Sequence, residues 1–184
     1  SETKEKEEAA ARVKSDMNYE LTENMVEYRP EHERMLYSLG LAGSAFKKVY
    51  HDPNIGRQVA LYISAEDVIV PYGASTIEFA ERVTHVMRRS KNDIKKLQAS
   101  EFYRDVDLGD PTPYHSDLEE KKAEEGGYSL TDDDRYTLYE IHADLIIEGI
   151  DDDDDIARPY VVTMERGSGE VLAIRRNYEE DDPL

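Results

Sequence analysis

The first quarter of the chain carries one apolar stripe at helical spacing. Intervals of three and four residues separate Val13, Met17, Leu21, Met25 and Tyr28, which places them on one face of an amphipathic helix. We expect this helix to end at Arg29, because Pro30 disfavours helical geometry in the residue before it. Pro30 also suits the first position of a second helix, which ends in Gly40–Gly43. Residues 2–11 are charged and Ala-rich, and we expect a frayed helix start or disorder there.

Strand patterns begin after residue 44. Phe46–His51 and Gln58–Ile63 flank a turn, Asp52–Gly56, in which Pro fixes φ while Asn and Gly permit unusual φ values. The sequence therefore predicts a β-hairpin, followed by a short strand at Val68–Pro71. Two segments have the spacing of a capping box: Ser75–Glu78 opens a brief helix, and Ser90–Asp93 precedes a helix with Ile94 and Leu97. The residues Val83–Ser90 alternate as a strand does.

The last third of the chain has a period of two. Five apolar residues alternate with polar ones and predict one face of a half-buried strand: Tyr139, Ile141, Ala143, Leu145 and Ile147. Glu140, His142 and Asp144 would occupy its wet face. Tyr160–Glu165 and Glu170–Tyr178 are expected to pair as a hairpin. Before them, His115–Glu125 favours a helix with little to bury, so we expect a solvated or mobile helix, or disorder.

The order of these elements predicts the α+β class. N-terminal helices come first, mixed β-hairpins with short helices follow, and an antiparallel β-meander closes the chain. The corresponding segments are a helical segment at 1–44, an α+β body at 45–108, a linker or mobile helix at 109–130 and the meander at 131–184. We expect the meander to pack on the body, so that the chain forms one domain.

Charge is distributed unevenly along the chain. The net charge is −19, yet residues 1–100 hold 15 Lys and Arg against 16 Asp and Glu, whereas residues 101–184 hold 8 against 26. An acidic field of that size disfavours non-specific adhesion to a phosphate backbone. The chain has no Cys, so disulfides and thiolate metal sites are excluded. No apolar run approaches the length of a membrane span, and no membrane partner is expected.

The acidic runs are the clearest candidates for metal chemistry. Asp151–Asp155 offers five consecutive carboxylates, but a specific Ca²⁺ or Mg²⁺ site needs ligands at staggered positions and a turn-forming Gly. Asp132–Asp134 is judged in the same way, and both are expected to be solvated loops. No catalytic, metal or cofactor residue is predicted: His51, His85 and His115 lie in no triad motif, and no nucleotide-binding motif occurs.

One basic cluster interrupts the acidic pattern. It consists of Arg88, Arg89, Lys91, Lys95 and Lys96, at the end of a predicted strand and the start of a predicted helix. Such a cluster is either a solvated face or a contact with another subunit or with DNA phosphate. Contact with an acidic neighbouring subunit is the more informative functional interpretation, because electrostatic complementarity fixes register and orientation.

Several segments resemble the portal proteins of tailed bacteriophages of the P22-like kind. The central block is Leu41–Pro53, Leu-Ala-Gly-Ser-Ala-Phe-Lys-Lys-Val-Tyr-His-Asp-Pro, with Met35–Tyr37 before it and Tyr62–Val70 after it. Met17–Glu23 and Arg88–Asp93 extend the resemblance, which continues to the closing hairpin. These segments are not catalytic signatures, so the specificity of the resemblance comes from their length and order.

The resemblance implies a structural role without catalysis. Portal subunits of this family form a twelve-membered ring at one capsid vertex, through which double-stranded DNA passes during packaging and ejection without sequence-specific binding. The implied partners are other portal subunits, terminase, capsid and tail proteins, and the implied location is the virion, assembled in the bacterial host cytoplasm. The chain is shorter than such portals and starts without Met, so we expect a mid-chain piece from the wing region. Alone, this piece is expected to be a monomer or weak oligomer.

Two other classes of function remain open on the sequence. The first is a metal-dependent hydrolase or nuclease that uses the Asp-rich loops with His142. The second is an acidic protein that mimics DNA or acts as an adaptor. Titration with divalent cations separates the hydrolase from the other two hypotheses, since only a hydrolase requires stoichiometric metal binding.

Overall fold

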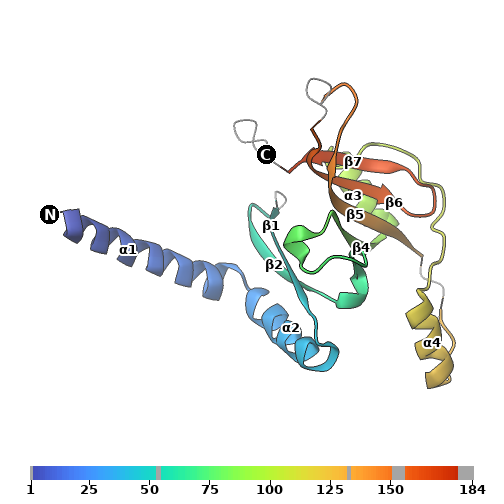
Figure 1. Cartoon of the computed structure of the whole chain (residues 1–184), viewed down its shortest axis with the longest axis horizontal. Coiled ribbons are helices and arrows are strands. Elements are labelled where there is room, and N and C mark those ends of the chain that lie inside the picture. The colour runs from blue at the N-terminus through green and yellow to red at the C-terminus, as the bar shows by residue number, and fades with distance from the viewer. Residues whose placement is uncertain (1, 53–54, 132–133, 151–155, 178–184) are drawn as a thin grey trace. The chain divides into compact units, whose positions relative to one another are not determined.

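The computed structural model describes residues 2–52, 55–131, 134–150 and 156–177. Four α-helices and seven strands in two antiparallel sheets lie within these residues, which confirms the α+β class (Figure 1). Contacts divide the chain into two compact units, Ser1–Val68 and Ile69–Leu184. Among the described helices, none combines the length and the apolar character that crossing a membrane requires. The segment boundaries expected from the sequence stay predictions.

The N-terminal unit begins with two helices whose junction differs from the prediction. Helix α1 spans Glu2–Tyr19 and continues as a π-helical turn, Glu20–Asn24, while α2 spans Tyr28–Ala42. The break therefore lies at residues 25–27, where Met25 N donates to Glu20 O at 2.8 Å, and not at Arg29. Pro30 is tolerated inside the first turn of α2 because the first four N–H groups of a helix have no intrahelical acceptor. The N-terminal residues expected to be frayed or disordered are helical.

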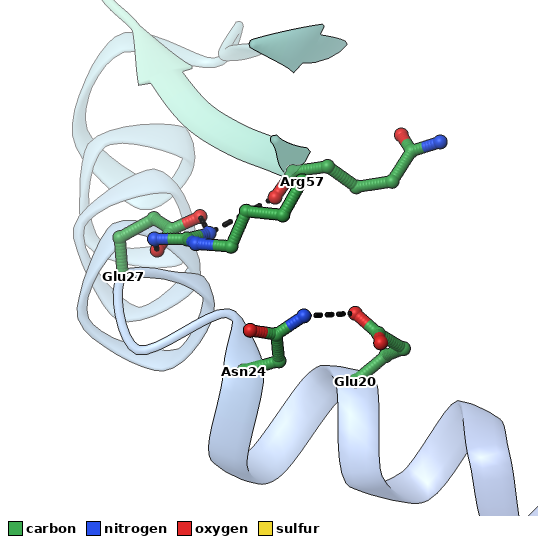
Figure 2. Close-up of polar contacts among 5 residues, drawn as sticks. Glu20, Asn24, Glu27 and Arg57 are labelled. Atoms are coloured by element: carbon green, nitrogen blue, oxygen red, sulfur yellow. Dashed lines mark hydrogen bonds and ion pairs between the residues drawn. The ribbon is translucent and has the colours of Figure 1, made fainter. Parts of the chain in front are cut away.

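The predicted hairpin of the N-terminal unit is confirmed. Strands β1, Phe46–Asp52, and β2, Arg57–Ile63, pair antiparallel from Phe46↔Ile63 to Asp52↔Arg57. Helix α2 packs against β2, and the buried apolar residues described in this unit are few: Met25, Val59, Ala60 and Ile63. Polar contacts reinforce the packing. Glu31 Oε2 accepts a hydrogen bond from Tyr62 N at 2.8 Å, and Glu20 and Glu27 bind Asn24 and Arg57 (Figure 2).

The C-terminal unit is built on a five-stranded antiparallel sheet in the order β3-β4-β5-β6-β7. Its strands are β3 Val68–Ile69, β4 Arg82–Ser90, β5 Arg135–Leu145, β6 Arg158–Glu165 and β7 Val171–Arg176. The closing hairpin is thus confirmed. Short 3₁₀ helices occupy Ala65–Asp67, at the end of the N-terminal unit, and Ile77–Phe79, in the C-terminal unit. The second of these begins after Thr76, which forms no side-chain cap, so the capping box expected at Ser75–Glu78 does not form.

Two longer helices of this unit begin at serine caps. Helix α3, Lys91–Ala99, starts after Ser90, whose hydroxyl accepts a hydrogen bond from Asp93 N at 3.1 Å, as predicted. Helix α4, Asp117–Gly126, starts with a capping box between Ser116 and Glu119 and ends at Gly127. The helix expected in this region is therefore formed; its mobility stays a prediction. Each serine satisfies an N–H group that the helix itself cannot.

The main core lies on the face of the sheet that faces α3. It contains Met87, Ile94, Tyr103, Tyr136, Leu138, Leu172 and Ala173. The prediction for β5 missed that the opposite face is buried at the start of the strand. Tyr136 and Leu138, at 3% and 0% exposure, share a face with Glu140 and His142, whereas the apolar residues from Tyr139 onward are only half-buried. Ile94, Tyr103 and other residues of α3 and the segment after it supply the cover that buries this face.

Candidate functional site: basic residues of strand β4 and helix α3

The structure distributes the five predicted contact residues over two elements and more than one surface. Arg88 and Arg89 are consecutive on β4, so their side chains leave opposite faces of the sheet. Lys91, Lys95 and Lys96 lie on α3, where Ile94 and Leu97 face the core. All five basic side chains are exposed. The sequence cluster is therefore not one continuous patch.

Arg88 forms an ion pair within the chain. Its Nη2 lies 2.7 Å from Glu119 Oε1, and both side chains are about one-third exposed, at 35% and 28%. Burial alone would raise the pKa of the Glu119 carboxyl, but the Ser116 amide, the Ser116 hydroxyl and Arg88 together hold this pKa below its usual value. Helix α4 is thereby attached to β4, and the charge of Arg88 is neutralised locally.

Lys91 also has an acidic neighbour. Its Nζ lies 3.5 Å from Asp110 Oδ1, in a pair that is largely exposed. Lys91 and Lys95 line a cavity of about 50 Å³ between α3 and residues 106–108. A cavity of that size holds a water molecule or two and no larger ligand. It is too small to bind a nucleotide.

Arg89 lies near the buried Tyr103. Burial raises the pKa of the Tyr103 hydroxyl, and the nearby charges of Arg89 and Arg175 act in the opposite direction.

Two of the five predicted contact residues are paired to carboxylates. The other three, Arg89, Lys95 and Lys96, remain as exposed cations. An exposed group of three cations can make weak, salt-dependent contacts with a phosphate or an acidic subunit.

The polar residues predicted for the wet face of β5 come together only in part. His142 Nε2 lies 3.0 Å from Glu140 Oε1, while Asp144 is exposed further along the strand. Within the ranges that the structure describes, no group of three or more His, Asp or Glu side chains could hold a metal ion. Asp151–Asp155, Asp132 and Asp133 lie outside the described residues.

One set of contacts was not predicted from the sequence. Phe102, Arg104 and Arg175 meet along strand β7: Arg175 Nη2 donates to Phe102 O at 2.6 Å, and Arg104 Nη1 donates to Val171 O at 3.0 Å. The signal available was Arg175–Arg176, the second Arg-Arg pair of the chain, which lies in its acidic half. Pairing it with residues about 70 positions earlier requires the fold.

Comparison with known proteins adds no relative. No family model matches the chain, and no curated protein matches it either.

Proposed function

We propose that this chain is a structural piece of a bacteriophage portal subunit, part of the ring through which DNA is packaged and ejected. The observation that carries the proposal is the ordered resemblance of Met17–Glu23, Leu41–Pro53 and Arg88–Asp93 to that family. In the fold, Leu41–Pro53 contains the end of helix α2 and all of strand β1. It thus lies within one helix–hairpin unit.

The electrostatics support a protein past which DNA moves. The second half of the chain has 26 acidic against 8 basic residues, and Arg88 and Lys91 of the basic cluster are paired with Glu119 and Asp110. Each phosphate contact adds a salt-dependent increment of affinity, so few exposed cations mean weak retention of DNA. The role is one of shape and surface potential, and no substrate is turned over.

The deciding experiment uses the complete gene product that contains this sequence. We expect native mass spectrometry and negative-stain imaging to show a closed ring with cyclic symmetry, because heterologous interfaces that close generate rings. A gene product that stays monomeric, also when it is produced together with its neighbouring capsid and terminase genes, would refute the proposal.

The competing functions give different results on the chain itself. Calorimetric titration with Mg²⁺, Mn²⁺ and Ca²⁺ should show no stoichiometric binding in the micromolar range, which a metal-dependent nuclease would require. Stoichiometric binding, together with DNA cleavage that is lost in Asp144→Asn and His142→Gln, would establish the nuclease. Tight binding to a nucleic-acid enzyme in place of ring formation would establish the DNA mimic.

A further inference from the structure

Strand β7 forms one edge of the five-stranded sheet, and half of its backbone polar groups point away from β6. Asn177 N donates to Pro159 O at 2.9 Å. Hydrogen-bonded and non-hydrogen-bonded pairs alternate along an antiparallel ladder. From this bond, Val161↔Arg175 is a hydrogen-bonded pair and Val162↔Ile174 is not. The N–H and C=O of Ile174 therefore point toward the open edge.

The first part of this edge is already covered by the segment Phe102–Arg104. Arg104 N donates to Leu172 O at 2.8 Å, and the Arg104 side chain donates to Val171 O. This segment adds a single backbone hydrogen bond to the edge of the sheet. Among the described residues, no backbone hydrogen bond of this kind reaches Ile174, which is 49% exposed. The edge is thus half covered and half available.

A cavity lies beside the edge. Its volume is about 380 Å³, and it is lined by Glu101, Phe102, Arg104 and Val171–Arg175. That volume lies within the range of ligand pockets, roughly 300–1,000 Å³. It can accommodate side chains from an added strand, while the backbone of that strand pairs with Ile174.

Arginines surround this edge. Arg104, Arg175 and Arg176 are exposed in a half of the chain that is otherwise strongly acidic. The Arg175 guanidinium lies over the Phe102 ring, 3.4 Å from its centroid, and burial lowers its pKa. The stacking and the bond to Phe102 O fix the guanidinium in place, so an incoming carboxylate meets a pre-oriented donor.

We propose that the open edge of β7 accepts an extended acidic segment of a partner protein as a sixth strand of the sheet. Main-chain hydrogen bonds to Ile174 supply the pairing, and the arginines select carboxylate side chains. Charged residues at an edge normally protect a sheet from indiscriminate pairing. Here the same charges repel basic strands and admit acidic ones. The inference concerns β7 alone and does not require that the chain belong to a portal ring.

The test uses the whole ¹⁵N-labelled chain and a seven-residue blocked peptide that alternates Glu with Val. Measurements at about 0.15 M salt screen the distant carboxylates of the chain, because the Debye length is then about 8 Å. We expect saturable NMR shifts centred on Ile174 and slower hydrogen exchange of its amide. A matched peptide with Lys in place of Glu should produce neither effect. The proposal is overturned if the Glu peptide gives no saturable shift at concentrations up to about 1 mM. A dissociation constant of about 1 mM corresponds to a binding free energy of about −4 kcal/mol.

Variants separate the two contributions. Arg104→Gln combined with Arg175→Gln should weaken binding of the Glu peptide at least about tenfold, while Arg12→Gln on helix α1 serves as a matched control without effect. Ile174→Pro removes an N–H that faces away from β6, and it should abolish the binding of the Glu peptide. If the double arginine variant binds the peptide as well as the unaltered chain, the proposal is wrong, whatever the outcome for Ile174→Pro.

Discussion

Glu27 and Arg57 form a bidentate ion pair, with Arg57 Nη1 and Nη2 each 2.8 Å from a different oxygen of the Glu27 carboxylate (Figure 2). The pair joins the turn between helices α1 and α2 to the first residue of strand β2, 30 positions later. Both side chains are about four-fifths buried, at 18% and 21% exposure. Two parallel hydrogen bonds fix an orientation that a single bond would leave free.

This pair predicts a pH dependence of stability. The hydrogen bonds from Arg57 hold the pKa of Glu27 below its usual value of 4.5. A lowered native pKa contributes stability above the unfolded-state pKa, and the contribution is lost as the pH falls through the native pKa. We therefore expect Glu27→Gln to lower the unfolding free energy at pH 7, with a difference from the unaltered chain that shrinks below about pH 4.5 and vanishes in stronger acid.

The matched control for Glu27→Gln is Glu33→Gln. Glu33 pairs with Arg29 at 3.0 Å, but both side chains are largely exposed, at 64% and 85%. Exposed ion pairs contribute little to the free energy of unfolding. Equal effects of the two substitutions at every pH, measured by urea denaturation, would contradict the structural role assigned to Glu27.

The left-handed backbone conformation of Glu101 predicts that its replacement by Gly stabilises the chain. It has φ 59° and follows helix α3, where Phe102 N donates to Leu97 O at 2.9 Å and Glu101 N donates to Gln98 O at 3.0 Å. This is a Schellman motif with Glu at the position that usually holds Gly. Glu101→Gly should stabilise the chain by about 0.5–1 kcal/mol, because it removes a Cβ from the left-handed region. Glu101→Ala retains the Cβ and should bring no such gain in thermal unfolding.

Replacement of the buried Glu165, in the turn between β6 and β7, is expected to lower the free energy of unfolding. The residue is 3% exposed, and its carboxylate accepts hydrogen bonds from Gly167 N, Ser168 N and Ser168 Oγ. Removing the acceptor leaves these donors unsatisfied, so Glu165→Ala should cost about 1–3 kcal/mol of unfolding free energy. Glu165→Gln retains one acceptor oxygen and should cost less. Glu170→Gln is the exposed control in the same turn. If it lowered the unfolding free energy as much as Glu165→Ala does, the loss of charge alone would account for the effect.

The contact between Arg88 and Glu119 predicts a modest coupling. Both side chains are about one-third exposed, so a double-mutant cycle with Arg88→Met and Glu119→Gln should give about 0.2–1 kcal/mol. The same substitutions should accelerate hydrogen exchange in α4, Asp117–Gly126, and leave α3 unchanged. A coupling of zero with normal protection of α4 would show that the capping box and Ala123 attach this helix without the ion pair.

Local signals in the sequence were sufficient for several elements. The turn Asp52–Gly56 predicted the first hairpin, and Ser90 predicted the start of α3, because caps and turns depend on the backbone preferences of a few adjacent residues. The same kind of rule failed at Pro30. Proline excludes helix before it in general, but not within the first turn, and the helix starts at Tyr28.

The sequence by itself determined the class of fold and the positions of most strands, since a period of two and a capping serine act over short distances. The tertiary structure alone decided that Leu138 of β5 is fully buried, because Ile94 and Tyr103 cover it from other parts of the chain. It also decided that Arg88 is paired and that Arg104 and Arg175 meet at β7, since both arrangements join residues 31 to 73 positions apart. Charge can be counted along a chain, but its partners are set by how the chain folds.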